Sequence, residues 1–250
     1  MDTLKGKVAL VTGGAGGLGT AICQHLAREG ASIVVGYNSS REPAERLAAG
    51  LPGESQQHVA LPAPVTDSSA LAELAAQVER RYGRLDLLVN CAGTTRFVAH
   101  DDLDGLDDAL IDQILATNVR GPFACVRALR PLLQKSGAGL VVNITSIAAV
   151  TAMGSNVMYC ASKAAVDNMT RSLARALAPT VRVVSVAPGL TDTEFVKGLD
   201  DNWRNEQAER TPLKRLAKPD EVAAAVLALA TQLTFTTGAI IPVDGGRPLT

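Results

Sequence analysis

Tyr159 and Lys163 lie four residues apart in a stretch whose apolar residues recur with helical spacing. Both side chains therefore belong on one face of an expected helix. A nearby ammonium group favours the phenolate form of a tyrosine, and such a phenol can act as a general acid or base on an alcohol or a carbonyl. Ser146 follows the apolar run Leu140–Ile144, which places it at the carboxyl end of an expected strand, where open α/β folds bind ligands. Without Ser146 the pair would be weak evidence, because tyrosine and lysine at this spacing also meet in ordinary surface packing.

A glycine-rich segment, Thr12–Gly19, joins the apolar run Lys7–Val11 to a helix expected over Gly17–Glu29. A strand, a glycine turn and a helix in this order gather backbone N–H groups and the positive end of a helix dipole at one point, where glycines let a pyrophosphate approach the backbone. Two overlapping fingerprints are present: Gly-x-Gly-x-x-Gly at Gly14, Gly16 and Gly19, and Thr-Gly-x-x-x-Gly-x-Gly at Gly13, Gly17 and Gly19. The segment predicts a dinucleotide phosphate site, although 22 glycines in one chain also cluster by chance.

The end of the second expected strand favours NADP over NAD. The dinucleotide fingerprint normally continues to an acidic residue that binds the ribose 2′-hydroxyl of NAD. Here the strand end carries no carboxylate and is followed by Asn38, Ser39, Ser40 and Arg41. Hydroxyl groups, an amide and a guanidinium attract a 2′-phosphate. The alternative is that Arg41 only caps or solvates the next helix.

The elements that must position these residues alternate along the chain as strands and helices. Several apolar runs are continuous, as in strands covered on both faces, and they alternate with segments of helical period. Strands are expected at Lys7–Val11, Ser32–Tyr37, 57–61, Leu85–Val89, Leu140–Ile144, Val181–Val186 and Ala239–Val243. Helices are expected at Gly17–Glu29, Ser68–Arg81, Gly121–Gln134, Asn156–Ala178 and Pro219–Ala230. This order predicts an α/β fold: a doubly wound (Rossmann) parallel sheet of about seven strands with helices on both faces.

We expect residues 1–250 to form one dinucleotide-binding domain, because no linker or internal repeat interrupts the alternation. The segment 190–212, called the lid segment below, fits the pattern least and is interpreted as a mobile lid or a small helical insertion over the substrate. Within it Phe195 and Trp203 are candidates to face the substrate or to pack in the core.

Composition excludes several partner classes. Twenty-four basic and 25 acidic residues give a net charge of −1, so we expect no nucleic acid and no anionic membrane as partner. No apolar stretch is long enough to span a bilayer, and no secretory signal is recognisable, so a soluble cytoplasmic protein is expected. The four cysteines lack Cys-x-x-Cys spacing, and no metal site is expected.

Two further patterns are interpreted as structural, and a third is left open. The segment His100–Gly105 resembles half of a calcium loop but lacks two of the required ligands, which leaves a solvated acidic helix start that could rim the substrate cleft. His25 and His58 have no carboxylate or serine pattern near them in sequence. Gly154 and Ser155 serve either a turn or the substrate pocket.

Taken together, the motifs resemble those of the short-chain dehydrogenases/reductases over the whole chain, up to Val243-Asp244-Gly245-Gly246. The resemblance rests on residues in the family's order and spacing: Thr12-Gly13 to Gly19, Asn90-Cys91-Ala92-Gly93, Asn118, Ser146, Tyr159-x-x-x-Lys163 and Pro188-Gly189. It implies that Tyr159 is the catalytic acid/base and that Ser146 polarises the substrate oxygen. It also implies that Lys163 contacts the nicotinamide ribose and favours ionised Tyr159, and that Asn118 anchors a water in the proton relay.

The same resemblance implies the cofactor-binding residues. They are Gly13, Gly16, Gly17, Leu18 and Gly19 at the phosphates; Asn38, Ser39, Ser40 and Arg41 at the ribose; Val65, Asn90, Ala92 and Gly93 toward adenosine; and Tyr159, Lys163, Pro188, Gly189, Leu190 and Thr193 toward nicotinamide. Two residues depart from the family pattern. Cys91 replaces the second asparagine of Asn-Asn-Ala-Gly, and Pro64 stands where relatives often carry an aspartate that contacts adenine.

The expected activity is interconversion of a secondary alcohol and a ketone with NADP(H) preferred over NAD(H). The overall sequence is similar to 3-oxoacyl-(acyl-carrier-protein) reductases, but the loop before Tyr159 lacks the Asn-x-Gly-Gln pattern of that subgroup, so sugar, polyol and steroid substrates remain open. A non-catalytic NADP-sensing regulator and an epimerase or dehydratase are alternatives. Intact Ser146, Tyr159 and Lys163 disfavour the first, and the chain length disfavours the second. A homotetramer or homodimer is expected for members of this family.

Overall fold

The computed structural model describes residues 3–53, 58–198 and 200–249. In this part of the chain seven strands form one sheet in the order β3-β2-β1-β4-β5-β6-β7, and every neighbouring pair is parallel. The winding reverses between β1 and β4, and in such sheets the crevice at the carboxyl ends of those two strands is where ligands bind. The strands are β1 Val8–Thr12, β2 Ser32–Tyr37, β3 Val59–Pro62, β4 Leu87–Asn90, β5 Gly139–Ile144, β6 Val181–Pro188 and β7 Ile240–Val243.

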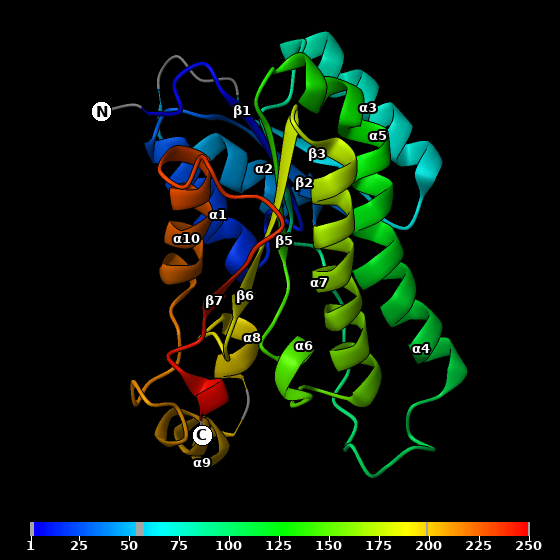
Figure 1. The fold of residues 1–250 in the computed structure, drawn as a ribbon, viewed down its shortest axis with the longest axis vertical. Helices are drawn as coiled ribbons and strands as arrows, with labels where there is room; N and C mark the ends of the chain where they lie inside the picture. The colour runs from blue at the N-terminus through cyan, green and yellow to red at the C-terminus, as the bar shows by residue number, and fades with distance from the viewer. Residues whose placement is uncertain (1–2, 54–57, 199, 250) are drawn as a thin grey trace.

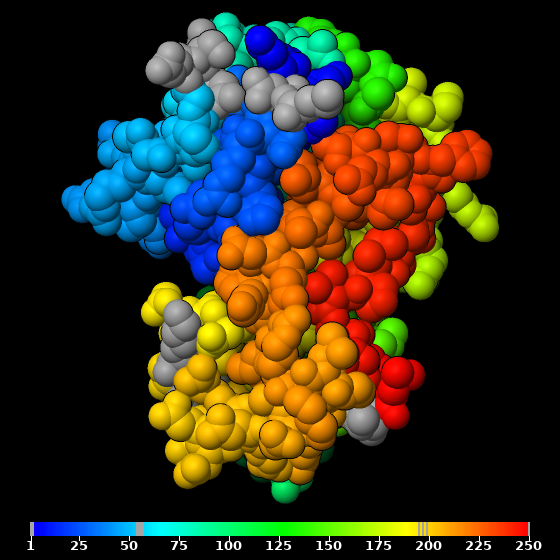
Figure 2. All heavy atoms as spheres, turned by 90° about the vertical axis from the view of Figure 1, so that its left-hand side faces the viewer, coloured from blue at the N-terminus to red at the C-terminus, as the bar shows by residue number. Residues whose placement is uncertain are grey.

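Helices cover both faces of the sheet (Figure 1). Side chains alternate along β1, so that Ala9 and Val11 enter one buried cluster while Val8 and Leu10 enter the other. This explains why the strand sequences are apolar at consecutive positions. The first cluster lies under α1 and α10, which pack side by side, as the blue and orange spheres show in Figure 2. The second lies under α3, α5 and α7, which cover the other face in Figure 1.

The helices confirm the five predicted from periodicity and add several shorter ones. The helices are α1 Gly17–Arg28, α2 Arg41–Gly50, α3 Ser68–Tyr82, α4 Asp108–Leu115, α5 Gly121–Lys135, α6 Ala148–Thr151, α7 Val157–Leu177, α8 Glu194–Lys197, α9 Asp201–Glu209 and α10 Pro219–Thr231, with a π-helical turn η1 Ala116–Arg120 and a 3-10 turn η2 Arg247–Leu249. The Asp67 carboxylate accepts hydrogen bonds from backbone N–H groups at the start of α3, and Pro219 begins α10.

Strand and helix boundaries shift by one or two residues from the prediction. β2 agrees at both ends, whereas β6 continues two residues further, to Pro188. The strand expected over 57–61 begins at Val59, and residue 57 lies outside the described residues. Helix α2 was not among the helices predicted from apolar spacing, because only Ala44 and Ala48 of its ten residues are buried and the apolar period is therefore too weak to detect.

The lid segment, residues 190–212, contains two helices. Thr193 caps α8 through Val196 N, and the Arg204 guanidinium of α9 donates to Asp192 at 2.9 Å. Backbone hydrogen bonds join Leu190 and Asp192 to Ala217. In Figure 1 α8, α9 and the C-terminus gather at the end of the molecule where β6 and β7 point. The lid segment therefore lies at the carboxyl edge of the sheet.

The structure adds a partner for His25 and corrects one expectation, that of a helix start in the acidic segment after His100. His25 does have a carboxylate partner, since its Nε2 lies 3.0 Å from Asp220 Oδ1. The sequence hid this contact because Asp220 belongs to α10, which is distant in sequence and packs on α1. The acidic segment after His100 forms turns and is not itself a helix start: α4 begins at Asp108 and is capped by Asp107.

His58 has a structural contact, accepting from Ile33 N through Nδ1 at 3.1 Å. Within residues 3–53, 58–198 and 200–249 no group of three His, Cys, Asp or Glu side chains is arranged to hold a metal ion. Among the helices of the described residues, none has the length and apolar character needed to cross a membrane.

We expect Glu221→Gln to lower Tm at neutral pH and to have little effect at pH 2. Hydrogen bonds from Arg215, then from Lys218 N, hold the pKa of Glu221 at about 2, below its ordinary value of 4.5. A carboxyl whose pKa is lowered by folding stabilises the fold above its unfolded pKa, and this contribution is lost as pH falls toward the folded pKa. Thermal unfolding of the wild type and the variant between pH 7 and pH 2 measures this contribution of Glu221 to stability. A Tm difference that is independent of pH would contradict the lowered pKa of Glu221.

Candidate active site at the carboxyl edge of the sheet

The carboxyl ends of β1, β2 and β4 are joined by hydrogen bonds at the reversal point of the sheet. The buried Thr12 hydroxyl accepts from Cys91 N and Ala92 N, both at 3.1 Å. Gly14 N donates to Gly36 O at 2.9 Å, which holds the glycine turn against the end of β2. The two predicted cofactor segments, the glycine turn and Asn90–Gly93, are therefore fixed side by side.

Glycine is required by geometry within the turn. Gly13 has φ of +63°, a conformation that residues with a Cβ rarely adopt. A Cβ at Gly19 would press on the Gly13 carbonyl oxygen and would lie 2.8 Å from Gly14 Cα. Helix α1 starts after Gly16 and has no side chain capping its first turn. Its first-turn N–H groups therefore remain available for an anion beside exposed Gly16 and Gly17 and half-buried Leu18.

The structure brings the four predicted catalytic residues to the same edge. Lys163 Nζ lies 5.6 Å from the centroid of the Tyr159 ring and donates to Ile144 O, at the end of β5, at 2.9 Å. Ser146 follows two residues later, and its Oγ accepts from Ala148 N at 3.1 Å. Lys163 is buried, whereas Ser146 and Tyr159 are half-buried. Ser146 and Tyr159 are thus partly accessible to solvent, whereas the Lys163 ammonium group is buried.

Asn118 lies in the π-helical turn η1 between α4 and α5, and π turns often occur at functional sites. Its Oδ1 accepts from Thr94 N at 2.8 Å, and its Nδ2 donates to Thr94 O and to Ser162 Oγ. A Cβ at Gly93 would lie 3.5 Å from Asn118 Oδ1 and 3.8 Å from Lys163 Nζ. Asn118 and Lys163 therefore both border the Gly93 backbone.

Asn90 is placed differently from Ala92 and Gly93. Its amide donates to Asn143 Oδ1, Asn143 donates to Thr170 Oγ1, and Thr170 pairs with Ser185, each at 2.8 Å in buried surroundings. This chain of hydrogen bonds links β4, β5, α7 and β6. The Asn90 amide is therefore engaged inside the protein, and only its Oδ1 has no partner among the described residues.

The predicted nicotinamide-side residues border the lid segment. A Cβ at Gly17 would lie 2.9 Å from the Thr193 side chain, so the start of the lid segment rests on the glycine turn. A Cβ at Gly189 would lie 3.0 Å from Asp244 Cα, so little space exists there for a side chain. Pro188 ends β6 in the core, and Leu190 is half-buried.

The predicted ribose-side residues Asn38, Ser39, Ser40 and Arg41 are all exposed after β2. Ser40 stands at the start of α2 but makes no capping hydrogen bond with its hydroxyl, and Arg41 Nε contacts Glu45 Oε1 at 2.8 Å. Val65 is buried, and its side chain lies against Gly121, where a Cβ would come within 2.8 Å.

Sequence patterns did not reveal four contacts around the site. Phe97, 51 % exposed in the segment after β4, meets Trp203 of α9 edge to face at 6.1 Å between ring centroids. Gly154 packs on Tyr159, since a Cβ there would lie 3.0 Å from Tyr159 Cδ1. Ser155 bonds to Thr95, and His100 to Gly154 O. No sequence signal marks these long-range contacts. The side chain of Phe195, the other aromatic candidate, lies outside the described part of the structure.

Cys91 is not a nucleophile in this setting. Burial raises the pKa of its thiol to about 11, and the opposing charge of Lys163 only partly offsets this. A thiol that stays protonated at neutral pH is a poor nucleophile and metal ligand. The residue that replaces the usual second asparagine is therefore a small, half-buried side chain beside the hydrogen-bonded backbone.

Known proteins resemble this chain over nearly its whole length. A family model described as enoyl-(acyl carrier protein) reductase matches residues 13–247. The 3-oxoacyl-(acyl-carrier-protein) reductase FabG of Thermotoga maritima is 36 % identical, covering 97 % of this chain and 98 % of its own, and D-threitol dehydrogenase of Mycolicibacterium smegmatis is 37 % identical, covering 97 % and 93 %. A solved short-chain dehydrogenase/reductase from Brucella melitensis superposes with a TM-score of 0.90 at 31 % identity, covering 98 % and 97 %.

The chain belongs to the short-chain dehydrogenase/reductase family. It is an oxidoreductase of the CH–OH/C=O class, and its doubly wound sheet agrees with the fold predicted from sequence.

Proposed function

We propose that this protein reduces a ketone to a secondary alcohol, or catalyses the reverse reaction, with NADP(H) in preference to NAD(H). The observation that carries the proposal is the convergence of Ser146, Tyr159, Lys163 and Asn118 at one sheet edge, beside a glycine turn whose helix start has no side-chain cap. A regulator that only binds a nucleotide has no need of a phenol placed above a buried cation.

The residues present fit a dinucleotide. Its pyrophosphate would bind the first-turn N–H groups of α1 at Gly17, Leu18 and Gly19, beside the exposed backbone of Gly16. Its adenosine end would lie toward Asn38–Arg41, Val65 and the Asn90–Gly93 backbone, and its nicotinamide end toward Pro188, Gly189, Leu190 and Thr193. When bound, the cofactor supplies or accepts the hydride.

Each polar side chain has a distinct task in this proposal. Tyr159 gives a proton to the carbonyl oxygen during reduction and removes it during oxidation. Ser146 donates a hydrogen bond to the same oxygen and so holds it against the phenol. Lys163, fixed by Ile144 O, stabilises the phenolate that forms and faces the nicotinamide ribose. Asn118 holds the Thr94 backbone beside Lys163 and so shapes the route by which protons return to the site.

The lid segment supplies the substrate side of the cleft in this proposal. Phe97 and Trp203 bring an apolar contact from α9 to the segment after β4, above the sheet edge. Such a cover excludes water while hydride and proton are transferred. It also leaves substrate choice to the lid segment and to the loop that precedes Tyr159.

The proposal is tested by mixing purified protein with NADPH or NADH and a panel of ketones, and following loss of the reduced cofactor. We expect turnover with NADPH and slower turnover with NADH. The reverse reaction is followed with the matching alcohols and NADP. No turnover of any ketone or alcohol with either cofactor would reject the proposed activity.

Replacing Arg41 with alanine should raise the KM for NADPH about tenfold and leave the KM for NADH unchanged, because only the 2′-phosphate requires the guanidinium. Arg46→Ala is the matched control, since Arg46 lies on the same helix and pairs with Glu42. Steady-state kinetics with both cofactors measure the ratio of the KM for NADPH to the KM for NADH in each variant. A wild-type preference for NADH, or an equal effect of Arg41→Ala on both cofactors, would contradict the assignment of the ribose site.

A further inference from the structure

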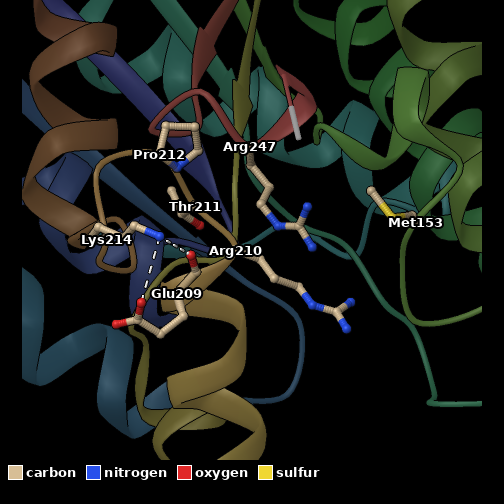
Figure 3. Close-up of a pocket in the computed structure, with 7 residues that line it drawn as sticks. All are labelled: Met153, Glu209, Arg210, Thr211, Pro212, Lys214 and Arg247. Carbon is tan, nitrogen blue, oxygen red and sulfur yellow. Dashed lines mark hydrogen bonds and ion pairs between the residues drawn. The ribbon is translucent and has the colours of Figure 1, made fainter.

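A cavity of about 500 Å³ lies between the loop before α7, the end of α9 and the C-terminal turn (Figure 3). A cavity of this volume admits a small molecule. It is distinct from the glycine turn where the dinucleotide phosphates would bind. The residues that line it are Met153, Glu209, Arg210, Thr211, Pro212, Lys214 and Arg247.

The cavity adjoins the reacting centre on two sides. Gly154, which follows Met153, packs on the Tyr159 ring. On the other side Leu213 N donates to Gly245 O, while Asp244 packs on Gly189 at the expected nicotinamide side. The cavity and Tyr159 are therefore neighbours, joined through Met153 and Gly154.

Cations dominate the walls. Three of the four charged lining residues are basic, and the one carboxylate, that of Glu209, lies 3.6 Å from Lys214 Nζ. Figure 3 shows the Arg210 and Arg247 guanidinium groups extending from one wall toward Met153, away from the Glu209–Lys214 pair. The two guanidinium groups thus reach the part of the cavity that the acidic side chain does not.

The ion pair between Arg210 and Glu206 does not prevent ligand binding. Its Nη2 pairs with Glu206 one helical turn earlier, and both side chains are more than half exposed. Exposed pairs of this kind contribute little free energy and exchange readily with another anion. Met153, 49 % exposed, and Pro212 give the cavity apolar surface for the carbon skeleton of a ligand.

We propose that Arg210 and Arg247 bind an oxyanion carried by the substrate, either a carboxylate or a phosphoryl group. This inference rests on the proposed function and names its substrate class: carbonyl or alcohol compounds with an anionic group at the end that does not react. Guanidinium groups bind both kinds of oxyanion through paired N–H donors. Neutral polyols and steroids carry no oxyanion and would gain no such paired hydrogen bonds from Arg210 or Arg247.

The test compares matched substrates with and without the negative charge. Acetoacetate is paired with methyl acetoacetate, and acetoacetyl phosphopantetheine with acetoacetyl pantetheine; the first pair probes a carboxylate and the second a phosphoryl group. We expect kcat/KM to be at least about tenfold higher for the anionic member of one pair, which identifies the oxyanion, and to fall with rising salt. The double variant Arg210→Gln/Arg247→Gln should lose this advantage and keep the kcat/KM of the neutral member.

Two controls separate charge from folding. Arg80→Gln removes an exposed arginine that pairs with Glu73 on α3 and should leave both substrate classes unaffected. Arg210→Lys/Arg247→Lys keeps the charge without the guanidinium geometry and should restore part of the advantage. Equal kcat/KM for charged and neutral members in the wild type, with ketone turnover intact, would overturn the inference and leave the proposed activity standing.

A binding measurement keeps the inference testable if no ketone is turned over. Trp203, the one tryptophan of the chain, lies on α9, which ends at this cavity, so its fluorescence reports occupancy. Titration with acetoacetate and with phosphopantetheine should give saturable binding that the double glutamine variant loses. Absence of turnover together with such binding would reject the activity alone, whereas identical titrations of wild type and variant would reject the oxyanion site.

Discussion

Replacing Tyr159 with phenylalanine is expected to lower kcat for ketone reduction by about 100- to 10,000-fold, the usual contribution of a positioned general acid. The variant loses one oxygen atom and keeps the ring that packs on Gly154 and lies beside Lys163. Cofactor affinity and Tm should therefore change little. Steady-state kinetics, cofactor titration and thermal unfolding on one preparation distinguish a loss of chemistry from a loss of structure.

Tyr82→Phe is the matched control. Tyr82 ends α3 and packs against the second buried cluster. The same chemical change there should leave kcat unaltered. A Tyr159→Phe enzyme that retains kcat within about threefold of the wild type would show that the proton comes from another group.

The sheet was predictable because its inner strands are buried on both faces, which leaves continuous apolar runs in the sequence. Val8–Thr12 and Ser32–Tyr37 show this clearly. Helix α2 lacked such a signal, since its packing depends on two alanines. Local composition thus revealed the elements that bury large apolar surfaces and missed those that bury little.

The residues of the candidate site were predictable from local motifs, but their surroundings were not. The glycine turn and the Tyr159–Lys163 pair are each a short segment of sequence. By contrast, Phe97 meets Trp203, and Arg210 faces the same cavity as Arg247, only because the carboxyl edge of the sheet gathers separate loops. Gly245 packing on Thr211 brings the C-terminal turn to the end of α9. Substrate specificity therefore depends on contacts that no spacing rule records.

Gly19→Ala should weaken the binding of NADPH at least about tenfold and lower Tm. The added Cβ would collide with the Gly13 carbonyl oxygen and with Gly14 Cα at 2.8 Å, and these are backbone atoms that cannot rotate away. The turn must open, which moves the N–H groups at the start of α1 and strains the Gly14 N–Gly36 O hydrogen bond. Overpacking of this kind costs about 1–3 kcal/mol of folding free energy.

Gly50→Ala is expected to change stability in the opposite direction from Gly19→Ala. Gly50 ends α2, has no atom within 4 Å of the position its Cβ would take, and does not have a positive φ. The substitution should raise stability by about 0.4–1 kcal/mol, because alanine has less conformational entropy to lose on folding. Cofactor titration and thermal unfolding of both variants measure the contrast. If Gly19→Ala bound NADPH as tightly as Gly50→Ala does, the phosphates would not depend on this turn, and the dinucleotide would have to bind elsewhere along the sheet edge.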